Sequence, residues 1–318
     1  NSERIKFKDG KDIFYHPEVF TQEYPVVLST TFSSRATIGN SSDFLFDYVI
    51  MDEASQVDVV TGALALSCAK NAVIVGDKMQ LPNVIEESKK LVVQELFKQL
   101  EISEGYNYIY SFLSSLELVL PDTPQTLLRE HYRCHPKIIN FCNQQFYGGK
   151  LLIMTEDKGE ENVLEAIKTV PGDFCKGHYN QRQIDVIKHD ILPRYTKEEI
   201  EDLGIIAPYN NQTDAIRNQI PGIDAATVHK YQGREKDNII ISTVDNEITS
   251  FTDDSNMLNV AISRAKKKLA IVISGNKQPE NSNIMSLLKY IEYNSGSIEE
   301  SKVSSVFDFF YTKNTEAK

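Results

Sequence analysis

The sequence predicts an α/β protein built from doubly wound parallel sheets. Short runs rich in Val and Ile alternate along the chain with segments of helical periodicity. These runs are apolar throughout, which indicates strands buried on both faces, as in a parallel sheet covered by helices. The chain has 318 residues, of which 41% are hydrophobic and 25% charged, so it is long enough for two ordinary globular domains.

Seven apolar runs are predicted strands, because each is short and is bounded by turn residues or by a helical pattern. In chain order they are residues 26–30, 48–52, 72–76, 126–130, 203–207, 238–244 and 268–274.

Helical patterns lie between these runs. Residues 137–146 place Ile138, Cys142 and Phe146 on one face, and Pro136 stands at a first helical position. Thr196 and Glu199 have the spacing of a capping box. Two further helices are predicted over residues 211–219 and 256–266.

A domain boundary is predicted at "PDTP" (121–124), where two prolines enclose polar residues. This boundary separates a first domain at 1–122 from a second domain at 123–290, and residues 291–318 form a tail.

Charge and cysteine content narrow the class of protein. The net charge of −11 argues against a protein that coats nucleic acid with its whole surface, although it leaves room for a narrow basic groove. The four cysteines form no CxxC pair, which favours a reducing, cytoplasmic location. The sequence contains no apolar run of membrane-spanning length and no secretory signal, so no membrane partner is expected.

Two strand ends carry polar groups suited to nucleotide hydrolysis. In "VIMDEASQ", Asp52 could hold Mg²⁺ and Glu53 could accept a proton from an attacking water. In "AVIVGDKMQLP", Gln80 could sense the γ-phosphate of a nucleotide. Ligands of open α/β sheets bind at such carboxyl ends of strands. The plainer alternative is that both stretches only terminate their strands with turn residues.

The segment "REHYRCHPKIINFC" offers two kinds of site. His131, Cys134, His135 and Cys142 are residue types that bind zinc, but their spacing is poor and Cys142 falls on the apolar face of a helix. Alternatively, Arg133 presents a planar guanidinium to a phosphate. A surface arginine with no such role remains open as a third interpretation.

Two later segments resemble phosphate-contacting loops. In "ATVHKYQGREKD", Gly233 lets the backbone approach a phosphate, and Glu235 could accept ribose hydroxyls. In "LNVAISRAKKK", Arg264 could stabilise charge on a transferring phosphoryl group. The alternative for both is a solvated loop or helix face.

Six motifs occur in a fixed order: "VIMDEASQ", "VGDKMQLP", "LREHYRCHP", "GIIAPYNNQ", "TVHKYQGREKD" and "LNVAISRAKKK". This series resembles motifs II to VI of the superfamily 1 helicases, and most of all the 5′-to-3′ branch that includes the nonsense-mediated-decay helicase. The resemblance implies two RecA-like domains, the first of them incomplete, with ATP bound in the cleft between them. It also implies movement along single-stranded DNA or RNA, driven by ATP hydrolysis.

The resemblance implies a role for each matched residue. For ATP and Mg²⁺, Asp52 holds the metal and Glu53 activates water, while Gln80, Arg133, Arg264, Gly233 and Glu235 contact the nucleotide. For the nucleic-acid strand, the matched positions are Thr30, Thr31, Tyr209, Asn210, Thr227 and His229.

One family motif is missing. The phosphate-binding loop G-x-x-x-x-G-K-[ST] does not occur, because neither Gly10-Lys11 nor Gly149-Lys150 has a glycine five residues before its own glycine. We expect that loop upstream in a longer protein, and we expect this chain alone to bind ATP poorly and not to hydrolyse it. The first sheet would then lack a central strand, and its open edge offers a surface for a second copy of the chain.

Two other functions remain open at the level of sequence. One is a nucleic-acid-binding scaffold that keeps the helicase fold without ATPase activity. The other is a nucleic-acid-stimulated ATPase that remodels complexes without unwinding them.

Overall fold

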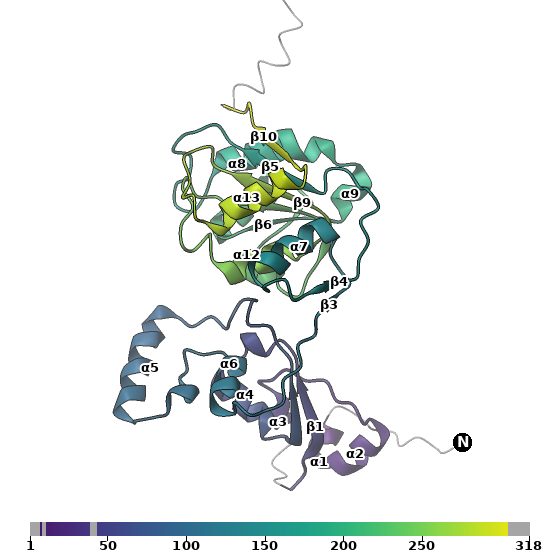
Figure 1. Cartoon of the computed structure of the whole chain (residues 1–318). Helices are drawn as coiled ribbons and strands as arrows, with labels where there is room; N and C mark the ends of the chain where they lie inside the picture. The colour runs from purple at the N-terminus through teal and green to yellow at the C-terminus, as the bar shows by residue number, and fades with distance from the viewer. Residues whose placement is uncertain (1–6, 8–10, 39–42, 305–318) are drawn as a thin grey trace, which may run out of the picture. The chain divides into compact units, whose positions relative to one another are not determined.

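The computed structural model describes residue 7 and residues 11–38 and 43–304. It divides the chain into two compact units, one ending at Thr126 and the other beginning at Leu127 (Figure 1). Each unit is considered by itself below. In the described part of the chain, no helix is long and apolar enough to cross a membrane.

The helices and strands of the first unit are α1 Asp12–Tyr15, α2 Pro17–Glu23, α3 Ser34–Thr37, β1 Phe46–Met51, α4 Val59–Leu66, β2 Ala69–Ile74, α5 Glu87–Gln99 and α6 Phe112–Val119. Strands β1 and β2 pair in parallel, with Phe46 opposite Ala69 and Met51 opposite Ile74. The predicted strands at 48–52 and 72–76 are therefore confirmed, each displaced by two or three residues at its start.

Among the described residues of the first unit, one buried cluster consists of Met51, Ala54, Ala65 and Phe112. Asp58 caps the start of helix α4, and its carboxylate accepts the Thr61 N–H (2.9 Å). A side chain at Gly62 would meet the Phe112 ring at 2.2 Å, so the contact between α4 and α6 requires glycine there.

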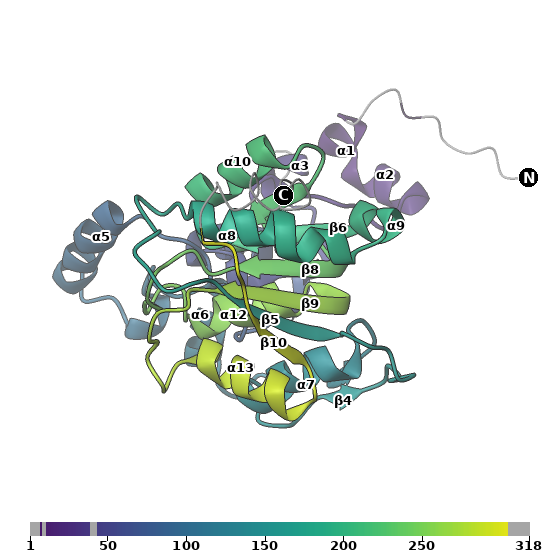
Figure 2. The ribbon, with the colours of Figure 1, turned by 90° about the horizontal axis from the view of Figure 1, so that it is seen from above.

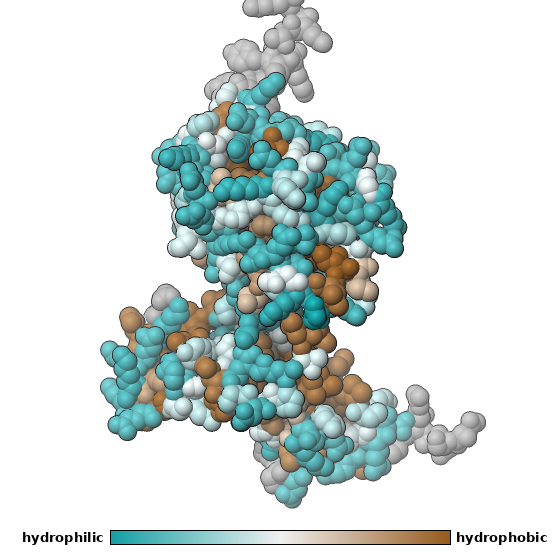
Figure 3. Space-filling view, in the orientation of Figure 1, coloured by the Kyte–Doolittle hydropathy of each residue, from teal (hydrophilic) through white to brown (hydrophobic). Residues whose placement is uncertain are grey.

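Many apolar side chains of the first unit remain exposed. On β1, Tyr48 is 63% and Ile50 is 71% exposed, and brown, hydrophobic residues are spread over this unit in Figure 3. The predicted strand at 26–30 is wrong, because these residues form no strand and Leu28 is 93% exposed. An apolar run becomes a strand only where a neighbouring strand accepts its backbone hydrogen bonds. The expectation that a second copy covers the sheet edge stays a prediction.

The helices and strands of the second unit are β3 Glu130–His131, α7 Pro136–Gln145, β4 Leu152–Ile153, β5 Leu164–Lys168, α8 Gln181–Val186, α9 Lys197–Glu201, β6 Leu203–Ala207, α10 Asn210–Gln219, β7 Asp224–Thr227, α11 Val228–Tyr231, β8 Lys236–Ser242, α12 Ser255–Ile262, β9 Ala265–Ile273, α13 Asn283–Tyr293 and β10 Ser297–Glu300. Helix α8 continues into a π-helical turn over Ile187–Ile191.

The main sheet of the second unit is parallel throughout and has the strand order β10-β5-β9-β8-β6-β7. Helices α8, α9 and α10 cover one face, and α7, α12 and α13 cover the other (Figure 2). All five residues of β6 are buried, as expected for a strand covered on both faces. The predicted doubly wound parallel-sheet fold is thus confirmed in the second unit.

Several predicted boundaries in the second unit need correction. Of the run at 126–130, only Glu130 joins the short strand β3. The helix predicted over 256–266 ends at Ile262, because Ala265 already begins β9. Strand β10 pairs with β5 over Ser297–Glu300, so the sheet extends beyond residue 290, where the tail is expected to begin.

Candidate nucleotide and nucleic-acid sites

In the first unit, Asp52 and Glu53 directly follow the carboxyl end of β1. The Asp52 carboxylate accepts the Glu53 N–H (2.8 Å), and Glu53 has a left-handed backbone with φ of 52°. That conformation is uncommon for a residue with a side chain, and it turns the chain sharply after the strand. The Gln56 amide donates to the Glu53 carboxylate (3.1 Å), which holds the carboxylate at the strand end.

Backbone hydrogen bonds join the carboxyl ends of β1 and β2. The Val75 N–H donates to the Met51 carbonyl (2.8 Å), and the Ala54 N–H donates to the Val75 carbonyl (2.9 Å). A side chain at Gly76 would approach the Ala54 nitrogen to 3.2 Å, so the close contact of the two loops depends on glycine. The two predicted strand-end motifs therefore lie side by side.

Gln80 lies on the loop after β2. Its side-chain amide donates to the Asp77 carboxylate (3.3 Å), whose other oxygen accepts the Met79 N–H (2.9 Å). Asp77 thus orders the loop that carries Gln80 next to the exit of β1.

The donor set at this edge fits Mg²⁺. Magnesium takes oxygen ligands and commonly binds through one or two carboxylates together with substrate phosphates. Asp52 is exposed, and its carboxylate stands at the carboxyl end of a parallel strand, where such ligands bind.

In the second unit, three motifs gather at the amino ends of β8 and β9. Arg133 forms an ion pair with Glu235, with 2.6 Å between Nε and the carboxylate. Arg264 is buried, and its guanidinium donates to the carbonyls of Val260 (3.1 Å) and Arg234 (3.3 Å). The resemblance expects Arg264 at a phosphate, whereas in this structure it ties the loop before β8 to helix α12.

Further bonds connect the "HYRCHP" segment to the start of β9. The His135 N–H donates to the Lys266 carbonyl (2.7 Å), and the Cys134 thiol donates to the Ser263 carbonyl (3.3 Å). The segment that carries Arg133 is therefore hydrogen-bonded to the residue before Arg264 and to the second residue after it.

Gly233 has φ of 75°, and no atom lies within 4 Å of where its side chain would be. The loop thus requires glycine for its backbone conformation and not for lack of space. Next to it, Arg234 stacks on the Tyr231 ring, 4.5 Å from its centroid, and pairs with Asp224.

The predicted zinc alternative does not fit the packing. The Cys134 thiol is buried and donates to the Ser263 carbonyl, and burial raises its pKa to about 12. Cys142 is fully buried in α7, and burial also raises the pKa of its thiol. Burial, together with the charges of Arg133 and Arg264, lowers the pKa of His131 to about 4, and its Nε2 accepts the Cys134 N–H (2.9 Å).

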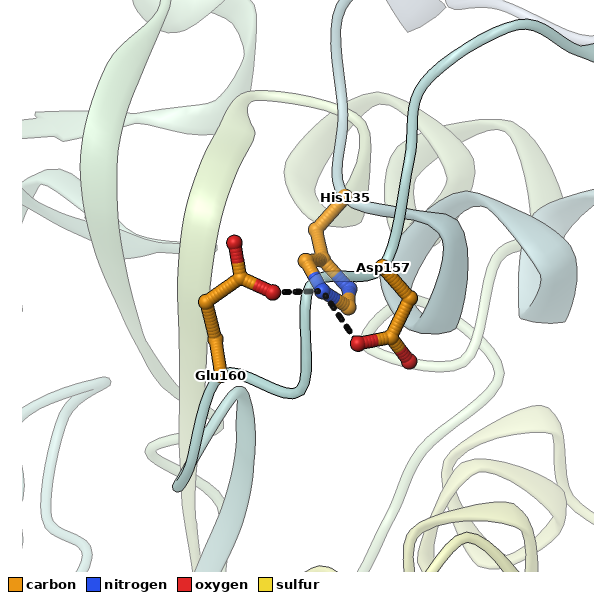
Figure 4. A group of neighbouring side chains, drawn as sticks. All are labelled: His135, Asp157 and Glu160. Carbon is orange, nitrogen blue, oxygen red and sulfur yellow. Dashed lines mark hydrogen bonds and ion pairs between the residues drawn. The ribbon is translucent and has the colours of Figure 1, made fainter.

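His135, Asp157 and Glu160 form a separate cluster (Figure 4). The Nδ1 of His135 accepts the Lys137 N–H (3.1 Å) and caps α7, so the neutral ring carries its proton on Nε2. That nitrogen lies 3.3 Å from Glu160 and 3.5 Å from Asp157. A metal ion would bind through a lone pair on Nε2. Because Nδ1 accepts the Lys137 N–H, Nε2 carries the proton of the neutral ring and has no lone pair to offer. The cluster is therefore best described as a helix cap held by carboxylates.

The residues expected to contact nucleic acid in the second unit lie at the opposite end of its sheet. Tyr209 and Asn210 follow β6, and Thr227 ends β7. Thr227 is buried, whereas Asn210 and His229 are exposed. Since the strands are parallel, the carboxyl ends of β6 and β7 are at the edge opposite to the amino ends of β8 and β9.

Sequence reasoning missed two aromatic neighbours of Tyr209. The ring centroids of His178 and Phe251 lie 4.1 Å and 5.4 Å from that of Tyr209. No local signal identifies these residues, because they come from loops far apart in the sequence.

In the first unit, Thr30 and Thr31 form the turn before α3. The Thr30 hydroxyl lies 2.6 Å from that of Ser33 and accepts the Ser33 N–H (3.2 Å). The Thr31 carbonyl accepts the Ser34 hydroxyl (2.7 Å). These bonds order a short turn that carries an exposed hydroxyl at Thr30.

Comparison with known proteins bears on the family. Two family models, each described as an AAA domain, match residues 5–88 and 172–277. The DNA replication ATP-dependent helicase/nuclease DNA2 of Gallus gallus is 31% identical over 257 residues, which cover 71% of this chain and 23% of that protein. The chain belongs to the superfamily 1 helicases. The probable helicase MAGATAMA 3 of Arabidopsis thaliana is 27% identical, over 83% of this chain and 34% of that protein.

This helicase chain spans between 20% and 39% of the length of such curated relatives. Among solved structures, it resembles the C-terminal domain of a possible DNA helicase from Lactobacillus plantarum, with 16% identity and a TM-score of 0.36. That match covers 52% of this chain and 98% of the other.

Proposed function

We propose that the protein is an ATP-dependent helicase or translocase that moves along single-stranded nucleic acid. The observation that carries this proposal is the gathering of Arg133, Glu235 and Arg264 at one edge of the second sheet. These residues come from three separate motifs: Arg264 fixes the loop before β8, and Arg133 and Glu235 form an exposed ion pair beside it. The relatives, which are named ATP-dependent helicases, support the same activity.

In the first unit, Asp52 would hold Mg²⁺, which supplies positive charge to the phosphates. Glu53 orients a water molecule and accepts its proton, and the fixed turn at φ of 52° sets the direction of its carboxylate. Gln80, on the loop ordered by Asp77, responds to the γ-phosphate.

In the second unit, Arg133 releases Glu235 and binds a phosphate in its place. Both side chains are more than 40% exposed, so the pair can separate at little cost in free energy. Glu235 is then available to ribose hydroxyls, beside the backbone of Gly233. Arg264 positions this loop, and a direct contact with phosphate requires its guanidinium to leave the Arg234 carbonyl.

The 318 residues contain no phosphate-binding loop of the G-x-x-x-x-G-K-[ST] type. We therefore propose that this stretch alone does not hydrolyse ATP. Thr30, Thr31, Tyr209, Asn210, Thr227 and His229 would contact the nucleic-acid strand.

The decisive experiment measures ATP hydrolysis by the full-length protein with and without single-stranded nucleic acid. Glu53→Gln is expected to lower kcat by about 10²- to 10⁴-fold and to leave binding of a fluorescent ATP analogue intact, because only proton transfer is lost. Glu292→Gln, an exposed position on α13, is the matched control and should keep full activity. Hydrolysis that survives Glu53→Gln would contradict the role assigned to Glu53.

A strand-displacement assay distinguishes the proposed activity from its alternatives. A helicase separates strands in the presence of ATP, and Glu53→Gln abolishes the separation. A remodelling ATPase hydrolyses ATP without separating strands, and a scaffold binds nucleic acid without hydrolysing ATP.

A further inference from the structure

Three aromatic rings from three loops of the second unit form one stack. Tyr209 lies nearly parallel to both neighbours, with interplanar angles of 29° to His178 and 28° to Phe251. Phe251 is 46% exposed, and His178 is also exposed. We call these three residues the aromatic platform. It lies at the carboxyl edge of the second sheet, where Tyr209 follows β6 and Phe251 follows β8.

Side-chain hydrogen bonds fix Tyr209 and the loop that carries Phe251. The Tyr209 hydroxyl donates to the Asp245 carboxylate (2.9 Å), which also accepts the Thr249 hydroxyl (3.3 Å). The Thr249 N–H donates in turn to the Thr252 hydroxyl (3.0 Å), which closes the turn around Phe251. Phe251 is therefore exposed because its loop holds it outward, and not because the loop is loose.

The acidic residues beside Phe251 have structural partners. Asp253 accepts the N–H groups of Asn283 and Ile284 (both 2.9 Å) at the start of α13. Asp254 accepts the Met257 N–H (2.8 Å) at the start of α12. Helix N-termini carry partial positive charge that offsets these carboxylates, so their repulsion of a nearby phosphate is reduced.

A positively charged side chain contacts the residue that follows Tyr209. The Lys230 ammonium lies 3.5 Å from the side-chain oxygen of Asn210, the residue after Tyr209. An exposed ring with a cation nearby matches what proteins use to bind single strands, where bases stack on aromatic side chains and phosphates meet basic groups.

We propose that the aromatic platform binds an unpaired nucleobase of the strand by stacking, with Phe251 as its exposed contact. This inference rests on the proposed function, and it adds His178 and Phe251 to the residues that contact nucleic acid. Bases of a duplex already stack on each other, so the platform selects single strands over duplexes. Because every base has a flat aromatic face, it does not select a sequence.

The test separates base contacts from backbone contacts. Equilibrium binding of the full-length protein is measured with a fluorescent single strand of thymidine or uridine nucleotides, and with a matching strand that carries abasic sites. Stacking of one base predicts about tenfold tighter binding of the strand that carries bases. Phe251→Leu should bring this ratio close to one without weakening binding of the abasic strand, and Phe251→Trp should retain it.

Tyr293→Leu is the matched control, since Tyr293 is an aromatic residue of the same unit and is 87% exposed. It should bind both strands as the unchanged protein does. Equal affinity of the unchanged protein for the two strands, or an unaltered ratio in Phe251→Leu, would overturn the platform while leaving the helicase proposal in place. Failure to bind either strand would overturn both proposals.

Discussion

At the scale of single residues, His131 has a pKa that depends strongly on the fold. Burial and the neighbouring arginines lower this pKa to about 4, whereas an unfolded histidine titrates near pH 6.5. Above pH 6.5 the ring is neutral in both states. As the pH falls from 6.5 towards 4, the unfolded chain takes up the proton first, so the folded state loses stability.

The resulting prediction concerns unfolding in urea at pH 7.5 and at pH 5. His131→Gln keeps an acceptor for the Cys134 N–H but does not titrate. It should lose about 1 kcal/mol less stability than the unchanged protein on going to pH 5, because part of the full linkage is screened by solvent. Equal losses in the two proteins would show that His131 does not titrate between these pH values on unfolding.

The ion pair between Arg133 and Glu235 matters more for the proposed function than for the stability of the fold. An exposed pair contributes about 0 to 1 kcal/mol to stability, so the fold does not depend on it. In the proposed function, Arg133 would release Glu235 and take up a phosphate in its place.

At the scale of elements, dense apolar runs predicted β6, β8 and β9 well, but the runs at 26–30 and 126–130 show that apolar density alone is not sufficient. Residues 203–207 match β6 to the residue, because all five are buried. Strand β5 was missed because it contains Glu165, which the fold buries, and β7 because its sequence, DAAT, carries little apolar signal. These strands exist because their neighbours complete the sheet, and a single sequence window does not show neighbours.

The candidate sites likewise contain features that the sequence shows and features that only the fold decides. Motif spacing identified Arg133, Glu235 and Arg264 as candidate site residues. It could not predict that Arg264 is buried against the backbone of Arg234. The aromatic platform was invisible because its rings are brought together only by the strand order of the sheet.

The loop before β8 gives a prediction at the scale of an element. Gly233→Ala places a side chain at φ of 75°, which costs about 1 to 2 kcal/mol or forces the loop to shift. Gly222→Ala is the matched control, because Gly222 has φ of 85° and equally open surroundings. Both variants should lose similar stability in thermal unfolding, but only Gly233→Ala should weaken ATP binding. Equal ATP affinity in the two variants would place Gly233 outside the nucleotide site.

At the scale of the whole molecule, the two units differ in the size of their cores. Within the part of the chain that the structure describes, one cluster of the first unit has four buried members, whereas one cluster of the second unit has fourteen. Stability grows with the apolar area that folding removes from water. The 318-residue chain should therefore contain a weaker and a stronger unit, which unfold separately.

This difference predicts two transitions when the 318-residue chain unfolds in urea, the first unit melting before the second. Phe112→Ala should lower only the first midpoint, because it removes the ring at the centre of the smaller core. Ile205→Ala should lower only the second midpoint, by an amount that corresponds to about 2 to 5 kcal/mol, because Ile205 is fully buried in β6. Hydrogen exchange read by mass spectrometry assigns each transition to its unit. A single transition that both substitutions shift together would show that the units fold as one, and the smaller core would then draw its stability from the larger.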